Sequence, residues 1–173
     1  LKDRIEKTVG WLFNEMLIST TNKAQGNNIA FAASLDADSE GEEGKYYVWT
    51  TTELASLLGD NFSAFARDYR VTDASNFPEG GDVNILNRLP PSLNNDNFEE
   101  EAQHAQSLDI LARAQSLRTP PGRDDKILAD WNGLVIAALA RLAPIFQNKN
   151  WLDKAEEAFE GVLQIMSYED AGF

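Results

Sequence analysis

The chain has 173 residues, enough for one ordinary domain with a substantial core. Its 15 Lys and Arg against 28 Asp and Glu give a net charge of −13, which argues against nucleic acid and anionic membranes as partners. The sequence has no cysteine, which excludes disulfides, thiol chemistry and Cys–zinc sites, and its single histidine, His104, cannot build a multi-histidine metal site. Chemistry must therefore come from carboxylates, hydroxyls, amides and aromatic rings, and we expect neither a metal nor a cofactor.

The two ends of the sequence suggest a piece cut from a longer protein. It begins at Leu1 already within a helical pattern, shows no signal-type segment, and stops just after another helical stretch. No run approaches the roughly 18 consecutive apolar residues that a membrane-spanning helix needs. We therefore expect residues 1–173 to form a single domain that does not associate with membranes, and we expect a cytoplasmic location.

The first half of the chain predicts short elements. Apolar residues at steps of three and four predict a helix over 1–20, followed by a polar break over 21–28. Two short runs, 45–49 and 83–86, read as strands that pair with each other. A capping box, Thr50-x-x-Glu53, begins a helix that Gly59 ends, and a further short helix covers 62–69. Residues 90–96 read as a loop.

Three longer helices are predicted in the second half. The first has an apolar face from Phe98 to Ala112, with acidic residues in its first turn and arginines near its end, as the helix dipole favours. Residues 119–122 end it. The second, 133–146, has one charge and should be buried on all sides, with Pro144 kinking or ending it. A tight connection at 148–150 makes an antiparallel hairpin with the third. The chain is therefore predicted to be mainly α, with at most one small β hairpin.

One segment gathers five carboxylates within eight residues, followed by three aromatic residues: Asp36, Asp38, Glu40, Glu42 and Glu43, then Tyr46, Tyr47 and Trp49. Three interpretations are open. A calcium loop fits its first positions but has Tyr47 where the bidentate glutamate belongs. A catalytic or sugar-binding site would use an Asp or Glu pair as acid and base, with Tyr47 or Trp49 as a platform for the sugar ring. A solvated acidic turn needs no ligand.

A second segment, 123–133, lies between a Pro-Pro-Gly break and the apolar helix. Arg123, Asp124, Asp125 and Lys126 can satisfy one another's charges. Asp130 can cap the following helix. Trp131 and Asn132 at the mouth of a buried helix would suit a polyol pocket, although tryptophan is also an ordinary core residue.

These two segments resemble the signatures of a family of large thioredoxin-domain-containing proteins whose animal members are called spermatogenesis-associated proteins. The first signature runs from Asp36 to Thr50 and the second, Asp-Asp-Lys-Ile-Leu-x-x-Trp-Asn-Gly, begins at Asp124. The resemblance covers roughly 31–166. It implies an N-terminal thioredoxin-like domain, absent from this chain, followed by a six-hairpin (α/α)6 toroid similar to those of glycosidases and N-acylglucosamine epimerases. This chain would be an incomplete part of that ring.

The resemblance raises interest in both segments without fixing their role. As an enzyme, the chain would use Asp36, Asp38, Glu43, Asp124 and Asp125 as catalytic carboxylates. Tyr47, Trp49, Arg123, Lys126, Trp131 and Asn132 would bind a small carbohydrate. The alternative is a non-catalytic scaffold or interaction module for the thioredoxin-like domain. We expect the two signatures to lie together at one end of the helices, with Arg123 and Lys126 offsetting the acidic loop. We also expect exposed apolar surface that the full ring would cover, and self-association through it.

Overall fold

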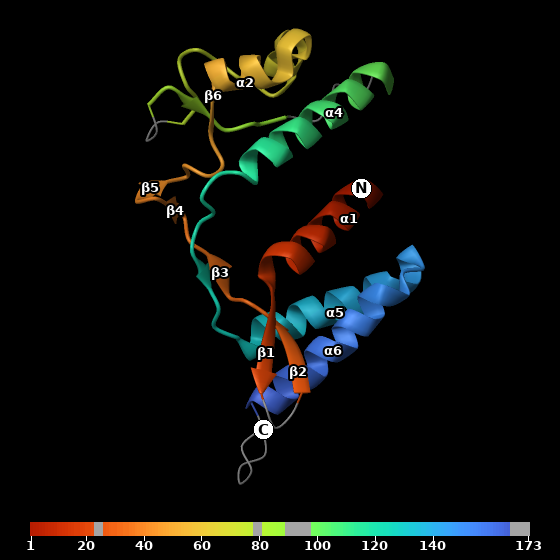
Figure 1. Ribbon diagram of the computed structural model, residues 1–173. Helices are drawn as coiled ribbons and strands as arrows, with labels where there is room; N and C mark the ends of the chain where they lie inside the picture. Colours follow the sequence, from red (N-terminus) through yellow and green to blue (C-terminus); the bar gives the residue numbers. More distant parts are fainter. Residues whose placement is uncertain (23–25, 78–80, 89–97, 167–173) are drawn as a thin grey trace. The chain divides into compact units, whose positions relative to one another are not determined.

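The computed structural model describes residues 1–22, 26–77, 81–88 and 98–166, in two compact units (Figure 1). Unit 1 joins the two ends of the chain, Leu1–Leu35 and Arg123–Phe173, and unit 2 is the continuous stretch Asp36–Gly122. The prediction of a mainly α chain is confirmed. The described residues also form four two-stranded ladders, where the sequence predicts at most one hairpin. The prediction of one domain stays a prediction.

Unit 1 begins with α1 (Lys2–Trp11), which continues through a π-helical turn (Leu12–Met16). The predicted helix to Thr20 is wrong in its last turn, because β1 (Leu17–Asn22) starts there and pairs antiparallel with β2 (Gly26–Phe31). The run Ile-Ser-Thr-Thr in β1 explains the change, since β-branched side chains favour a strand over a helix. Part of the predicted polar break is thus the second strand of a hairpin.

A helical hairpin completes unit 1, as predicted. The helices α5 (Ala129–Phe146) and α6 (Lys149–Met166) lie side by side (Figure 1). Pro144 lies in the last turn of α5, which ends two residues later at Phe146 and is followed by the left-handed C-cap residue Gln147. On α6, Gly161 approaches β2 so closely that a Cβ would overlap the carbonyl oxygen of Ile29. The ladder between β3 (Ser34–Leu35) and β8 (Arg123–Asp124) joins the two ends of the unit.

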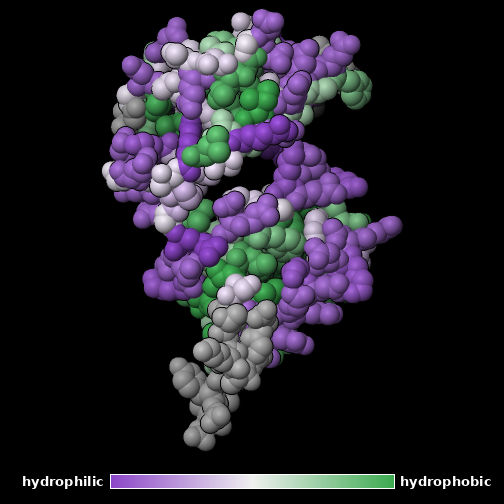
Figure 2. All heavy atoms as spheres, viewed as in Figure 1, coloured by the Kyte–Doolittle hydropathy of each residue, from purple (hydrophilic) through white to green (hydrophobic). Residues whose placement is uncertain are grey.

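The core of unit 1 lies where the β1–β2 hairpin meets α5 and α6. Its buried members include Ile29, Phe31, Leu139, Trp151 and Ala158. The prediction that the second long helix is buried on all sides is wrong: only 17% of α5 is buried, and Leu134 is 72% exposed. Its described neighbours cover one side only, which confirms the expectation of exposed apolar surface. Figure 2 shows hydrophobic residues, in green, at the surface of the face in view.

The composition of α5 also corrects the membrane argument. Over its 18 residues the mean hydropathy is 1.2, so by length and composition the helix could cross a membrane, although Asp130 and Arg141 interrupt its apolar residues. This is weak support, because core helices of soluble proteins pass the same test. The expectation of no membrane association therefore rests on the chain's negative charge alone.

Unit 2 contains a small hairpin and three helices. Its elements are β4 (Asp38–Ser39), β5 (Glu42–Glu43), β6 (Trp49–Thr50), α2 (Thr51–Leu58), a 3-10 turn (Gly59–Asn61), α3 (Phe62–Asp68), β7 (Val83–Asn84) and α4 (Phe98–Gln115). The predicted pairing of strands 45–49 and 83–86 is confirmed in part, since β6 pairs with β7, but only Trp49 of the first predicted run belongs to β6. The predicted cap is confirmed too, because Thr50 Oγ1 accepts from the N–H of Glu53. The predicted loop at 90–96 lies outside the described residues.

The core of unit 2 gathers side chains from β6, α2, α3 and α4. Trp49, Leu54, Leu58, Phe65, Tyr69 and Leu111 are its buried members. Phe65 and Tyr69 stack with ring centroids 4.1 Å apart. This core holds the acidic loop at one end of α4.

Candidate functional site

A hollow of about 510 Å³ lies in unit 2 between the acidic loop and the chain that follows α4. Carboxylates, cations and aromatic rings line it: Glu40, Glu42, Glu43 and Glu53, Lys45 and Arg118, and Tyr46 and Phe77. Ligand pockets commonly have volumes of about 300–1,000 Å³, so the hollow is large enough for a small molecule. It is the candidate site in unit 2.

The acidic loop is partly neutralised by its own lysine, Lys45. Lys45 Nζ lies 2.7 Å from Glu42 Oε1 and 3.5 Å from Glu40 Oε2. The hydrogen bond to Glu42 is the main reason why the pKa of Lys45 is raised. Asp36 Oδ1 accepts from the N–H of Asp38 at 3.3 Å, which makes a local turn. Arg123 and Lys126 belong to unit 1, so their predicted offset of the acidic loop stays a prediction, and Lys45 is a cation of unit 2 that acts on this loop.

Arg118 ties the loop to the segment after α4. Its guanidinium lies 3.9 Å above the ring of Trp49 and donates to the carbonyl oxygens of Tyr46 and Val48, each at 2.9 Å. It also donates to Glu53 Oε1 at 2.8 Å, which fixes the direction of that carboxylate in the hollow. The sequence does not reveal this role, because an arginine near a helix end is already explained by the helix dipole.

The predicted site residues of unit 2 are only partly brought together. Glu43 lines the hollow, whereas Asp36 and Asp38 are exposed and do not. Trp49 is buried under Arg118 and is not a platform for a ligand. Tyr47 is 45% exposed outside the hollow and contacts the ring of Tyr46 edge-on at 5.0 Å. Tyr46 is therefore the aromatic residue of the loop that faces the hollow.

The charged residues of the second signature pair with their own neighbours in unit 1. Lys126 Nζ lies 2.9 Å from Asp124 Oδ2, and this hydrogen bond lowers the pKa of Asp124. Arg123 Nε lies 2.5 Å from Asp125 Oδ1, and Arg123 also donates to the carbonyl oxygen of Glu15. These contacts form a solvated charge network, as one of the two interpretations of this segment predicts.

Asn132 acts as a structural clamp in unit 1. It is 1% exposed, and its Oδ1 accepts from the N–H of Phe31 at 2.8 Å. Its Nδ2 donates to the carbonyl oxygens of Phe31 and Leu128 at 3.0 and 2.9 Å. Both polar atoms of the side chain thus bind backbone and hold β2 against α5.

The structure also places Trp131 and Asp130, which lie with Asn132 in the first turn of α5. Trp131 is 48% exposed. Asp130 does not provide the predicted cap, because Leu128 is the N-cap residue and Asp130 Oδ1 accepts from the N–H of its neighbour Trp131. The two signatures belong to different units, so their meeting in one shared site stays a prediction.

No family model matches the chain. An uncharacterized protein of Caenorhabditis elegans is 27% identical over 157 residues, which cover 75% of this chain and 22% of that protein. Spermatogenesis-associated protein 20 of Homo sapiens is 29% identical over 139 residues, which cover 64% of this chain and 18% of that protein. The chain thus spans about a fifth of the length of these curated relatives. The human match supports the resemblance to the spermatogenesis-associated family as a distant similarity.

Proposed function

We propose that the hollow of unit 2 binds a small carbohydrate through its carboxylates. The observation that supports this is the meeting of Glu43, Glu53 and the ring of Tyr46 in one cavity of about 510 Å³. Carboxylates accept hydrogen bonds from sugar hydroxyls, and an aromatic ring offers an apolar face to the sugar ring. The resemblance to a family whose toroid is similar to glycosidases points to the same ligand class.

Glu43 and Glu53 are the residues that we assign to this function. Arg118 holds the carboxylate of Glu53 in one direction, as a fixed acceptor requires. Glu43 is exposed at the rim. A pair of carboxylates can serve as acid and base in glycoside hydrolysis, so turnover of the bound sugar is part of the proposal.

The proposal is tested by screening a library of mono- and disaccharides with saturation-transfer NMR. We expect at least one sugar to bind the wild type and to bind Glu43→Gln and Glu53→Gln much more weakly. The reason is that each substitution replaces one of the two acceptor oxygens of a carboxylate with an amide NH2 group. Glu99→Gln, an exposed change on α4 outside the hollow, is the matched control and should bind as the wild type does. Failure of every sugar, or equal binding by all variants, would contradict the proposal.

A second candidate function is a non-catalytic interaction module for a thioredoxin-like domain. It is favoured by an apolar groove of about 380 Å³ in unit 1, which α1 and α5 line with Ile5, Val9, Leu134 and Val135 among others. Mixing the chain with a thioredoxin-like domain of the longer relatives should give a complex in light scattering, and Leu134→Glu should abolish it. A homodimer that Leu134→Glu disperses would assign the groove to self-association instead.

A further inference from the structure

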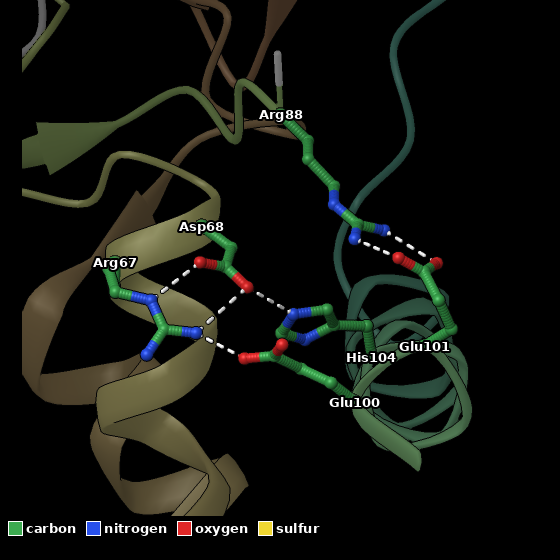
Figure 3. Close-up of polar contacts among 6 residues, drawn as sticks. All are labelled: Arg67, Asp68, Arg88, Glu100, Glu101 and His104. Carbon is green, nitrogen blue, oxygen red and sulfur yellow. Dashed lines mark hydrogen bonds and ion pairs between the residues drawn. The ribbon is translucent and has the colours of Figure 1, made fainter. Parts of the chain in front are cut away.

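We infer that Asp68, Glu100 and His104 form a binding site for a divalent transition-metal ion of the zinc class. The three residues lie in unit 2, on α3 and α4, and Figure 3 shows their side chains pointing toward one another. One ligand atom from each lies within 4.8 Å of the others. The site is separate from the hollow, because none of the three lines that cavity.

The histidine is held ready for a ligand. His104 is 2% exposed, and its ring meets those of Phe65 and Tyr69 edge-on at 5.9 and 5.6 Å, which fixes its orientation. Its Nε2 lies 2.7 Å from Asp68 Oδ2, so this nitrogen faces the carboxylates and not the apolar core. A buried imidazole whose nitrogen points at carboxylates has already lost the rotamer freedom that metal binding costs.

Helical spacing supplies the third ligand. Glu100 and His104 are four residues apart on α4 and so project from the same face of the helix. Asp68 comes from the end of α3. Ligand atoms around a tetrahedral ion lie about 3.3 Å apart when the bonds are about 2.0 Å long. The present spacing, within 4.8 Å, therefore requires only small side-chain movements.

A metal ion at this site must displace the guanidinium group of Arg67. Its guanidinium bridges Asp68, at 2.7 Å from Nε to Oδ1, and Glu100 (Figure 3). It thereby places one positive charge where a dication would place two. The Arg67 side chain is 63% exposed and can turn into solvent, whereas Asp68 and Glu100 are only 21% and 19% exposed, so the ion must compensate for the ion pairs that these two carboxylates lose. Next to the site, Arg88 pairs with Glu101, which keeps that carboxylate out of it.

The ligand set selects the metal. Imidazole nitrogens and carboxylate oxygens are both zinc donors, and a site with three protein ligands leaves the fourth position of the ion open to water or a substrate. Calcium and magnesium prefer oxygen donors alone, so they should bind here much more weakly. The sequence alone does not reveal the site, because Asp68 and His104 are 36 residues apart.

The test uses the fact that His104 is the only histidine in the sequence. Zinc is titrated into the full chain while the two imidazole nitrogens are followed by NMR, and affinity is measured against a chromophoric chelator. We expect the Nε2 resonance to shift with one equivalent of zinc and to ignore magnesium. We expect Glu100→Gln to lower zinc affinity by at least the roughly tenfold that loss of an outer-shell partner costs, and Arg67→Gln to raise it.

Glu101→Gln is the matched control, one residue away on α4, and should change zinc affinity by less than about twofold. Zinc that binds without shifting the His104 resonances, or that binds Glu100→Gln and the wild type equally, would overturn the inference and place the metal at other carboxylates. Weaker binding by Arg67→Gln would overturn the displacement step. Circular dichroism of each variant verifies that it is folded.

Discussion

Replacing Asn132 with leucine should lower the stability of unit 1. We expect this loss because Asn132 holds the backbone together and does not bind a ligand. Leucine has a similar shape but no polar atom, so the backbone N–H and carbonyl of Phe31 lose their side-chain partner. Phe31 is 3% exposed, so water does not readily replace that partner. The carbonyl of Leu128 keeps a partner, because it also accepts from the backbone N–H of Asn132.

The cost follows from the number of groups left unpaired. A buried backbone group without a hydrogen bond costs about 1–3 kcal/mol, so two such groups in Asn132→Leu cost about 2–6 kcal/mol. Domains of ordinary size unfold with about 5–15 kcal/mol, so this loss is a large share of the total. Asn150→Leu, an exposed change on α6, should stay within about 0.5 kcal/mol.

Urea unfolding followed by circular dichroism measures the loss, and hydrogen exchange at the Phe31 amide locates it. We expect a lower midpoint for Asn132→Leu and faster exchange at Phe31, with the Asn150→Leu control unchanged in both. An Asn132→Leu chain with wild-type stability that has lost binding of a sugar would refute the clamp and restore Asn132 as a ligand-binding residue.

Three further predictions concern stability. Gly161→Ala should cost about 1–3 kcal/mol in urea unfolding because its Cβ overlaps the β2 backbone, whereas Gly133→Ala, with open space at its Cβ, should gain about 0.5–1 kcal/mol; equal effects would contradict the close approach. Thr50→Ala should cost about 1 kcal/mol through the lost cap, and Thr52→Ala should not, as thermal melts can verify. The pKa of Asp68 lies below its ordinary 3.8, mainly through the hydrogen bond from Arg67, so the stability that it adds is complete above about pH 4 and is lost as pH falls through the lowered value. Acid unfolding of Asp68→Asn should lack this component, and an unchanged acid transition would contradict the assignment.

The sequence predicts best those elements that depend on residues close together in the chain. The cap at Thr50, the end of α2 at Gly59 and the α5–α6 hairpin all depend on residues within a few positions of one another. The pairing of β6 with β7 is predicted in part, because 45–49 and 83–86 are the two short runs of aromatic, β-branched and apolar residues, although only Trp49 of the first run lies in β6. The end of α1 was misplaced, because continuing helical spacing competed with the strand preference of the residues after Met16.

The site residues were harder to predict because their partners are far away in sequence. Asn132 binds Phe31 across 101 residues, and Arg118 binds Val48 across 70. A pattern within a short window can mark such residues as unusual but cannot separate a clamp from a ligand contact. The acidic loop is a different case, because the cation that pairs with two of its five carboxylates, Lys45, is near them in sequence.

The assembly of unit 1 from both ends of the chain has a consequence for the order of folding. Residues 1–35 can complete unit 1 only after the residues from Arg123 onward have been synthesised. Closing a loop the length of unit 2 costs on the order of 4 kcal/mol in chain entropy. Unit 2 is continuous, and its own ends meet where the N–H of Asp36 donates to the carbonyl of Gly122 at 2.7 Å. Once unit 2 has folded, it brings Leu35 beside Arg123 and shortens the loop to a turn. During synthesis unit 2 is thus expected to fold first, and its folding brings the two segments of unit 1 together.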